Sequence, residues 1–284
     1  MDRRKFVKRA AGAALGAIGA GGMYPLVEAK WCHVLRATVR VPNLPAPFVG
    51  TTVALISDVH HGPYVPRVYI RHAVAMTNAL RPDIVALCGD YVFRGRRYIA
   101  PGIAELGQLR ARLGRFAVLG NHDHYHGASE TRDALARAGI TEVGNSGVWL
   151  ERGGARLRVC GVDDFWHGVQ DLGAALGSAT GRDAVVLLSH NPDYVEGITD
   201  RRVGLVLSGH THGGQVVVPC LGAPRVPSMY GQKYLQGLVQ GPACQVFVTR
   251  GLGTVAPPVR FHCPPEVTLI TLQAGAHDER VASS

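Results

Sequence analysis

The sequence predicts an α/β domain in which two β-sheets stack face to face and helices cover their outer sides. Three observations favour this class. Short apolar runs recur along the chain, helical patterns separate the first of these runs, and closely spaced strands follow later. The 284 residues are 46% apolar and only 18% charged, so one large domain can bury a substantial core.

Five apolar runs predict the central strands, and each run ends in polar residues. Continuous runs rich in β-branched residues are typical of strands that are covered on both faces. These runs are TVALIS (52–57), DIVALC (83–88), FAVLG (116–120), AVVLLS (184–189) and GLVLS (204–208).

Three helical patterns lie in the first half of the chain. They are Val68–Leu80, roughly Ile99–Leu113, and Ser129–Ala138, with Ser129 as N-cap and Gly139 at the C-terminal end. The alternation of strands and helices predicts a largely parallel sheet. The later strands are closely spaced and favour antiparallel pairs; they are Val148–Glu151, Leu157–Cys160, Gln215–Val218, Gln245–Thr249 and Val267–Thr271.

The first 29 residues resemble an export signal. A basic start, MDRRKFVK, precedes a Gly/Ala-rich apolar stretch and a Val-Glu-Ala ending at Ala29. The pair Arg3–Arg4 followed by Phe6 resembles a twin-arginine signal. We therefore expect a signal segment over 1–29 and one domain over 30–284. The expected location is the periplasm or the outer face of the cytoplasmic membrane, reached through the twin-arginine export machinery.

Two alternatives for this segment stay open. It could be an ordinary basic N-terminal helix of a cytoplasmic protein, or it could remain uncleaved as a weak anchor. The apolar stretch is too short and too rich in glycine for a comfortable transmembrane span of about 20 residues.

The net charge of +9 suits an anionic substrate or an anionic membrane surface, and nucleic acid is also compatible with it. Residues 1–29 contribute five basic and two acidic side chains, so the remainder has 25 basic and 19 acidic residues, a net of +6. The six cysteines show neither a C-x-x-C pair nor zinc-ribbon spacing, and we expect none of them to be catalytic. Disulfide pairing stays open.

Residue types that bind metal ions follow each of the five apolar runs directly. Ligand sites in α/β sheets form beyond the carboxyl ends of the strands, so we expect these side chains to meet. Glycines precede several of them and let the backbone bend close to the site. The candidate ligands are Asp58, His60, Asp90, Asn121, His190, His210 and His212.

These ligand types predict a dinuclear centre that hydrolyses phosphate esters. Carboxylate oxygen, amide oxygen and imidazole nitrogen suit Mn, Fe or Zn. Two divalent ions roughly 3.5–4 Å apart acidify a bridging water and clamp the attacked phosphoryl group. One carboxylate must bridge the two ions, and Asp90 is the candidate because it stands alone at its strand end.

The ordered motifs resemble the signature of the calcineurin-like metallophosphoesterases. They are DVH (58–60), GD (89–90), GNHD (120–123), SHNPD (189–193) and GHTHGGQ (209–215). As an ordered set they are highly specific, and nearby strands extend the resemblance from about Thr51 to Leu272. The resemblance implies a four-layer fold of two mixed β-sheets flanked by helices. It also implies hydrolysis of phosphoric ester or pyrophosphate bonds by a hydroxide that bridges the metals.

The resemblance also implies a role for each site residue. One ion would be bound by Asp58, His60, Asp90 and His212, and the other by Asp90, Asn121, His190 and His210. His122 would be catalytic, protonating the leaving oxygen or stabilising the transition state. Asp123 would orient the ring of His122, as carboxylates commonly do for catalytic imidazoles.

Extended forms of these motifs are similar to those of one bacterial branch of the family, which holds exported or membrane-associated phosphodiesterases. DVHHG, LSGHTHGGQ and the tail RGLGT…PPVRF carry this likeness, and some relatives are UDP-2,3-diacylglucosamine pyrophosphatases of lipid A synthesis. The stretch GDYVFRG departs from the pattern, since many relatives have a further acidic residue after the Asp. We expect Tyr91 and Arg94 to contact the substrate there, although a solvated basic loop explains residues 91–98 equally well.

The leading hypothesis is an exported phosphodiesterase that acts on an envelope or lipid-linked phosphate. A UDP-2,3-diacylglucosamine pyrophosphatase-type enzyme ranks second, because an export signal conflicts with a substrate on the cytosolic face. A nuclease would need access to nucleic acid, a partner that export disfavours, and its binding would depend steeply on salt. A non-catalytic binding protein has no need for a full ligand set with His122.

Overall fold

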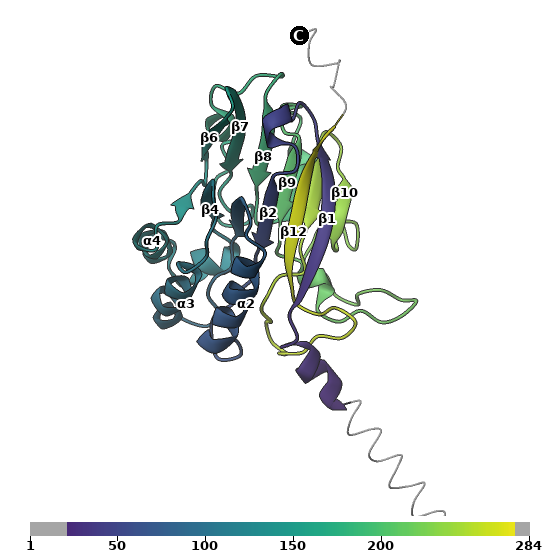
Figure 1. Cartoon of the computed structure of the whole chain (residues 1–284). Coiled ribbons are helices and arrows are strands. Elements are labelled where there is room, and N and C mark those ends of the chain that lie inside the picture. The colour runs from purple at the N-terminus through teal and green to yellow at the C-terminus, as the bar shows by residue number, and fades with distance from the viewer. Residues whose placement is uncertain (1–21, 276–284) are drawn as a thin grey trace, which may run out of the picture.

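The predicted apolar runs form the centres of two six-stranded sheets in a computed structural model, which describes residues 22–275 (Figure 1). The first sheet has the order β1-β12-β2-β3-β4-β5, and the strands from β2 to β5 are parallel. The bounds are β1 His33–Val41, β2 Thr52–Ile56, β3 Ile84–Cys88, β4 Gly114–Val118, β5 Thr141–Glu142 and β12 Glu266–Ala274.

The second sheet has the order β10-β11-β9-β8-β7-β6. Its four central strands are parallel, and the antiparallel strands β10 and β6 lie at the two edges. The bounds are β6 Ser146–Arg152, β7 Ala155–Gly161, β8 Ala184–Leu188, β9 Leu205–Ser208, β10 Gly237–Gln240 and β11 Gln245–Val248. The expected fold class is therefore confirmed.

Helices cover the outer faces of the two sheets and complete the four layers (Figure 1). The first sheet carries α2 (Arg67–Ala79), α3 (Ile99–Leu106) and α4 (Asn121–Arg137). The second carries α5 (Leu172–Leu176) and the 3-10 turn η3 (Pro192–Gly197). Further 3-10 turns are η1 (Ala46–Phe48), η2 (Arg96–Tyr98) and η4 (His212–Gly214).

Successive side chains of a strand point to opposite faces of the sheet, so one apolar run contributes to two hydrophobic cores. In β2, Val53 and Leu55 point into the core between the sheets, whereas Ala54 and Ile56 pack toward the helices. All four side chains are buried, which explains why the run is continuously apolar.

Several predicted boundaries were wrong. The predicted helix Ser129–Ala138 matches the second part of α4, which follows a kink at Gly127. The first part, from Asn121, was not predicted, and there the Asp123 carboxylate accepts the backbone N–H of Gly120 and caps the helix α4. It is interrupted at Gly127, where φ is 144°. The helix α3 ends at Leu106, with Gly107 at its C-cap, instead of continuing to Leu113.

The predicted strand over Gln215–Val218 does not form. Two isolated bridges, Val216 with Phe261 and Val218 with Gly222, take its place, so this segment is a loop. The sequence also missed β1 and β10, which lie at sheet edges, and the two-residue β5. Edge strands are exposed on one side and mix polar with apolar residues, so they do not form the continuous apolar runs that predicted the central strands.

The predicted signal segment falls partly outside the described residues. Its residues 1–21 are not described, while residues 22–28 form a short helix at the same end of the molecule as α2 and α3 (Figure 1). Within residues 22–275, no helix combines the length and the apolar character that a membrane span requires.

Candidate metal centre

Seven side chains meet where the central strands of both sheets end. Asp58 and His60 follow β2, Asp90 follows β3, and Asn121 opens the helix after β4. His190 follows β8, and the pair His210 and His212 follows β9. The strands β2, β3 and β4 are parallel neighbours, as are β8 and β9, so their carboxyl ends converge at one end of the sandwich. The structure thus brings all seven predicted ligands together, and all are buried.

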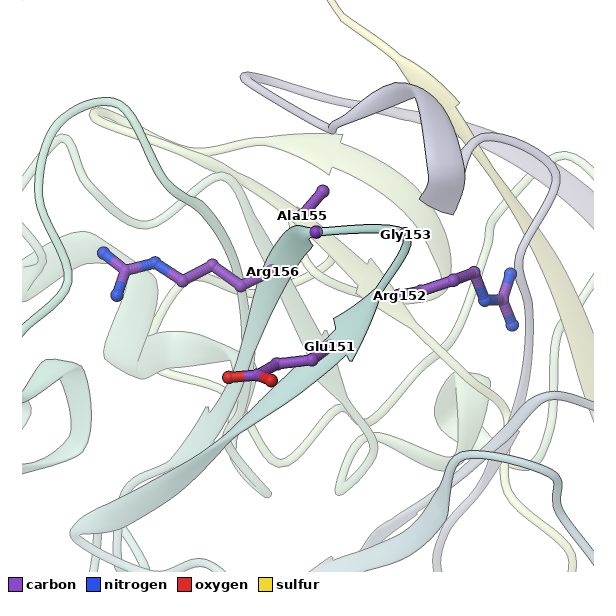
Figure 2. Close-up of a pocket in the computed structure, with 6 residues that line it drawn as sticks. Glu151, Arg152, Gly153, Ala155 and Arg156 are labelled. Atoms are coloured by element: carbon purple, nitrogen blue, oxygen red, sulfur yellow. The ribbon is translucent and has the colours of Figure 1, made fainter.

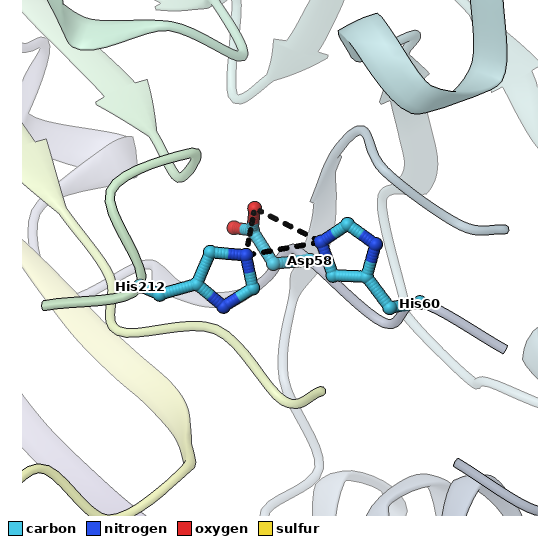
Figure 3. A group of neighbouring side chains, drawn as sticks. All are labelled: Asp58, His60 and His212. Atoms are coloured by element: carbon cyan, nitrogen blue, oxygen red, sulfur yellow. Dashed lines mark hydrogen bonds and ion pairs between the residues drawn. The ribbon is translucent and has the colours of Figure 1, made fainter. Parts of the chain in front are cut away.

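Asp58, His60 and His212 form the first group of possible metal ligands (Figure 3). The Nε2 atoms of His60 and His212 are 3.0 Å apart. The Asp58 Oδ1 atom lies 3.9 Å from Nε2 of His60 and 3.5 Å from Nε2 of His212. One carboxylate and two imidazoles from two different sheets therefore point at a common centre.

Asp90, His190 and His210 form a second group, and Asn121 adjoins it. The His190 Nε2 atom lies 3.1 Å from Nδ1 of His210 and 3.2 Å from Oδ1 of Asn121. The Asp90 Oδ2 atom is 3.4 Å from Nε2 of His190 and equally 3.4 Å from Nε2 of His60. Asp90 therefore stands between the two groups.

The residues fit divalent metal ions by their chemistry. The His190 Nδ1 atom lies 2.7 Å from the Cys88 carbonyl, and donating its proton there leaves the Nε2 lone pair free to face the group. Oxygen and imidazole donors of this kind suit Mn, Fe or Zn. Each group could hold one divalent cation, with Asp90 available to both.

Burial controls the protonation of the imidazoles. It lowers the pKa of His60 and of His210 to about 3 and that of His212 well below its usual range, so these rings stay neutral as ligands require. Burial also opposes a charge on His190, but the Asp90 and Asp58 carboxylates raise its pKa to about 10, so a metal ion would have to displace the proton on its Nε2 atom.

The two carboxylates differ in their electrostatic surroundings. Burial raises the pKa of Asp58 to about 6. Burial acts in the same direction on Asp90, but the neighbouring imidazoles, above all His190, hold its pKa well below the usual range. The two buried carboxylates thus favour a positive charge beside them, which a bound divalent cation would provide.

Five of the predicted ligands adopt a backbone conformation that side chains rarely take. The φ angles are 53° for Asp58, 48° for His60, 57° for Asp90, 69° for His210 and 54° for His212. Such residues persist only where the surroundings hold them, and they are common at functional sites. Here hydrogen bonds between the loops hold these residues: the Asp58 carboxylate accepts the N–H of His210, and the Asp90 carbonyl accepts the N–H of His60.

His122 lies beside both groups. Its backbone N–H donates to Oδ1 of Asp90 at 2.8 Å, and its ring meets the His60 ring edge-on with centroids 4.8 Å apart. Its buried Nδ1 atom has no hydrogen-bond partner. This side chain also lines the cleft described below, so it can reach a bound substrate.

The expectation that Asp123 orients His122 was wrong. The two side chains share no hydrogen bond in the structure. The Asp123 carboxylate instead accepts the backbone N–H groups of Asp90 at 2.8 Å, Tyr91 at 2.9 Å and Gly120 at 2.9 Å. Because Asp123 is the third residue of α4, its side chain points back toward the helix start, where these N–H groups lie. It fixes the Asp90 loop against the helix.

The expectation that Tyr91 contacts the substrate was also wrong. Its side chain is 1% exposed and packs into the core beneath the first sheet. Its hydroxyl lies 2.7 Å from the Val118 carbonyl and 3.0 Å from the Leu87 carbonyl. Arg94 is exposed, stacks over the Phe93 ring at 5.2 Å, and does not line the cleft.

A cleft of about 590 Å³ opens onto the metal-ligand groups. Its floor includes Asp90, Asn121, His210 and His212. Its walls are largely apolar; they are formed by Phe93, Trp166, Val216, Pro224, Pro227, Val255 and Pro257. Trp166 meets the His210 ring edge-on at 4.3 Å. Arg225 is the cation on this lining.

Most of these wall residues lie outside the predicted ligand motifs. Phe93 belongs to the GDYVFRG stretch, and the others come from three loops, around Trp166, over residues 216–227 and over residues 255–257. The exposed aromatic in the GVDDFWHG turn was the one available signal, because tryptophan in a turn is unusual unless it contacts something.

Other histidines close to the centre are not in the ligand groups. His61 lies 2.8 Å from the Val65 carbonyl, and His124 pairs with Asp163 at 2.9 Å. His126 accepts the backbone N–H of Arg94. The six cysteines are all free, and only Cys220 is exposed.

A second hollow of about 420 Å³ lies over the β6–β7 hairpin. Figure 2 shows Arg152 and Arg156 extending away from each other on either side of this hairpin. The hairpin turn precedes β7, which is parallel to β8, so it lies at the opposite end of the sheet from His190. This hollow therefore takes no part in the metal centre.

Comparison with known proteins identifies similar sequences. The sequence model described as calcineurin-like phosphoesterase matches residues 51–214. The metallophosphoesterase YkuE of Bacillus subtilis is 32% identical, over 96% of this chain and 98% of its own length. The phosphodiesterase YaeI of Escherichia coli is 30% identical, over 96% of this chain and 99% of its own length.

Two solved structures are similar at low sequence identity. The NAD nucleotidase of Haemophilus influenzae is 14% identical, with a TM-score of 0.46 over 70% of this chain and 49% of its own. The phosphopantetheinyl hydrolase of Mycobacterium tuberculosis is 14% identical, with a TM-score of 0.42 over 75% of this chain and 96% of its own.

Proposed function

Because this chain belongs to the calcineurin-like phosphoesterase family and is a hydrolase of phosphate esters, we propose that it cleaves phosphodiesters that carry an apolar group. The observation that carries the proposal is the cleft, in which an apolar wall adjoins the metal-ligand groups directly. Ligand sites of this kind combine apolar lining with a few polar groups that fix orientation. An envelope or lipid-linked phosphodiester has both parts.

The seven predicted ligands would hold two divalent ions, with Asp90 between them. When bound, such ions acidify water and stabilise charge on the phosphoryl oxygens. The Asp123 carboxylate fixes the backbone of Asp90, and burial keeps His60 and His210 neutral and ready to bind. His122, on the cleft wall, would donate a proton to the leaving oxygen.

Two further features support the substrate class. The Escherichia coli relative is named as a phosphodiesterase, which favours diesters over monoesters. Arg225 puts a positive charge on the apolar side of the cleft, where it can pair with an anionic group of the substrate.

The basic start of the chain with Arg3 and Arg4 supports export by the twin-arginine route to the periplasm or the outer face of the membrane.

Hydrolysis by the full-length protein tests the proposal. The protein is stripped with a chelator, refilled with Mn²⁺, and assayed on bis(p-nitrophenyl) phosphate and p-nitrophenyl phosphate. We expect metal-dependent cleavage of the diester in preference to the monoester. Preference for the monoester would contradict the diesterase proposal.

The apolar wall is tested with two p-nitrophenyl phosphodiesters that carry a dodecyl or a methyl group. We expect Trp166→Ala to lower kcat/KM at least about tenfold for the dodecyl ester and little for the methyl ester, since apolar contact area is lost only for the longer chain. Leu221→Ala, an exposed side chain that does not line the cleft, is the control. Equal loss on both esters would oppose an apolar-group site. Cleavage of UDP-2,3-diacylglucosamine alone would favour the pyrophosphatase alternative.

A further inference from the structure

The end of the predicted leader contacts the domain through Tyr24, Pro25 and Glu28, whereas Met23, Leu26 and Val27 are exposed. The Glu28 carboxylate is 2% exposed and accepts two backbone N–H groups, from Cys263 at 2.6 Å and from His262 at 3.1 Å. The Pro25 carbonyl accepts the N–H of Arg260 at 2.9 Å. Cleavage after Ala29, itself buried, would remove all three hydrogen bonds and leave three N–H groups without these acceptors, two of them on the buried residues Arg260 and Cys263.

The segment that this N-terminal stretch holds, residues 260–263, reaches the metal centre through Arg260. The Arg260 side chain is 0% exposed. Its guanidinium donates to five backbone carbonyls, of His212 (3.3 Å), Arg250 (2.7 Å), Gly251 (3.3 Å), Gly253 (2.7 Å) and Cys263 (3.0 Å). A buried guanidinium is tolerated only where such acceptors surround it, so Arg260 ties these segments together.

Two of these segments position ligands of the first group. The carbonyl of His212 accepts both from Arg260 and from the Cys263 thiol at 3.2 Å. On the other side, the N–H of Gly253 donates to the Asp58 carbonyl at 2.6 Å. Asp58 and His212 both hold positive φ, so each depends on its surroundings for its conformation.

We infer that residues 22–29 remain part of the working enzyme and act as a clasp on the metal centre. Glu28 and Pro25 fix residues 260–263, and Arg260 then fixes the loops of Asp58 and His212. Glu28 and Arg260 are positioning residues, since they touch no candidate ligand side chain. The inference concerns the first ligand group and holds whatever the substrate is. An exported enzyme would then keep residues 22–29, with Glu28 bound to the N–H groups of His262 and Cys263.

The first test is the N-terminus of the protein recovered from an exporting host. Peptide mapping by mass spectrometry should find a peptide that contains Glu28. A mature chain that starts at Lys30 and is fully active would overturn the inference.

The second test measures Mn²⁺ affinity by calorimetry on full-length Glu28→Ala, with Glu151→Gln as the control. Glu151 is an exposed acid at the far end of the second sheet (Figure 2). Because a positioning residue around a metal ligand commonly contributes 10–100-fold to affinity, we expect a loss of about that size at one of the two sites. The other site, built on Asp90, His190 and His210, should keep its affinity, and so should both sites of the control.

Glu28→Asp and Arg260→Lys complete the set. Glu28→Asp keeps the carboxylate and should restore part of the lost affinity. Arg260→Lys keeps the charge but cannot reach five carbonyls, and it should weaken the same single site. Equal weakening of both sites would indicate a general loss of fold and would overturn the inference. Unchanged affinity in Glu28→Ala would overturn it as well.

Discussion

The Nε2 atoms of His60 and His212 lie 3.0 Å apart, although the two residues are separated by 152 positions in the chain. Their rings are stacked at an angle of 18° with centroids 4.9 Å apart. Asp58 closes this group (Figure 3), and the neighbouring Asp90 connects it to the second group. The packing of one sheet on the other thus creates a site that neither sheet contains alone.

Removal of divalent metal should lower the thermal stability of the protein. Metal binding to the native state alone stabilises it by about 2.7 kcal/mol per site when free metal exceeds Kd 100-fold. For a chain of this size that corresponds to a fall in Tm of roughly 5–10 °C per site on chelation. Calorimetry with EDTA, followed by excess Mn²⁺, measures the loss and its recovery. An identical Tm in both conditions would argue against metal in this centre.

Asp90→Asn should abolish activity while the fold persists. The amide keeps the acceptor for the N–H of His122 but lacks the negative charge that stands between His60 and His190. Since partners outside the ligand shell already contribute 10–100-fold, we expect kcat/KM to fall more than about 100-fold. Elemental analysis should also show fewer metal ions per chain. Full metal content with normal activity would refute the shared role of Asp90.

His122→Ala should slow the reaction in a way that depends on the leaving group. A positioned general acid contributes about 10²–10⁴-fold, and mainly for leaving groups that need a proton. Diesters with an alkyl leaving group should therefore lose far more rate than bis(p-nitrophenyl) phosphate, whose nitrophenolate leaves readily. Metal content should be unchanged. A uniform loss across leaving groups would point to charge stabilisation instead of proton donation.

Tyr91→Phe should reduce stability and leave catalysis nearly unchanged. The hydroxyl is buried and lies within hydrogen-bond distance of the Val118 and Leu87 carbonyls. Its removal should lower the free energy of unfolding by about 1–2 kcal/mol, as for other buried hydrogen bonds. Urea unfolding and steady-state kinetics on the same sample separate the two effects. A large rise in KM would indicate that Tyr91 contacts the substrate after all.

The pair His124 and Asp163 should give the protein a pH-dependent increment of stability. The hydrogen bond to Asp163 raises the pKa of His124. Burial opposes the ionisation of Asp163, but its bond to His124 lowers its pKa nonetheless. The histidine contribution is therefore complete below about pH 6.5, the unfolded value, and is lost as pH rises through the folded pKa. The carboxylate contribution is present above about pH 3.9 and is lost as pH falls below it.

The stability difference between wild type and Asp163→Asn measures this increment. It should be larger at pH 5.5 than at pH 8.5, and NMR titration should show a lower pKa for His124 in the variant. A difference that grows toward high pH would contradict the pairing.

The sequence by itself determined the central strands, the fold class and the set of residues that meet at the strand ends. Those features depend on short-range regularities. A buried strand is a continuous apolar run, and the residues after it leave the sheet at its carboxyl edge. Asp58, Asp90 and His190 could therefore be placed without coordinates.

Only the tertiary structure decided which way several side chains of the same loops point. Tyr91 turns into the core and Asp123 turns back to cap its helix, where the motif alone suggested a substrate contact and a histidine partner. Both outcomes depend on how the loop after β3 meets the first turn of α4, which a local sequence pattern does not record.

The wall of the cleft and the clasp on the metal centre were likewise decided by tertiary structure. Trp166 and Arg225 reach the cleft from loops that lie outside the ligand motifs in the sequence. Glu28 and Cys263 form a hydrogen bond although they are 235 positions apart in the chain. Backbone periodicity and motif spacing describe residues that are close in sequence. Contacts between distant loops depend on how the two sheets and their loops pack in three dimensions, and so they became visible only in the folded chain.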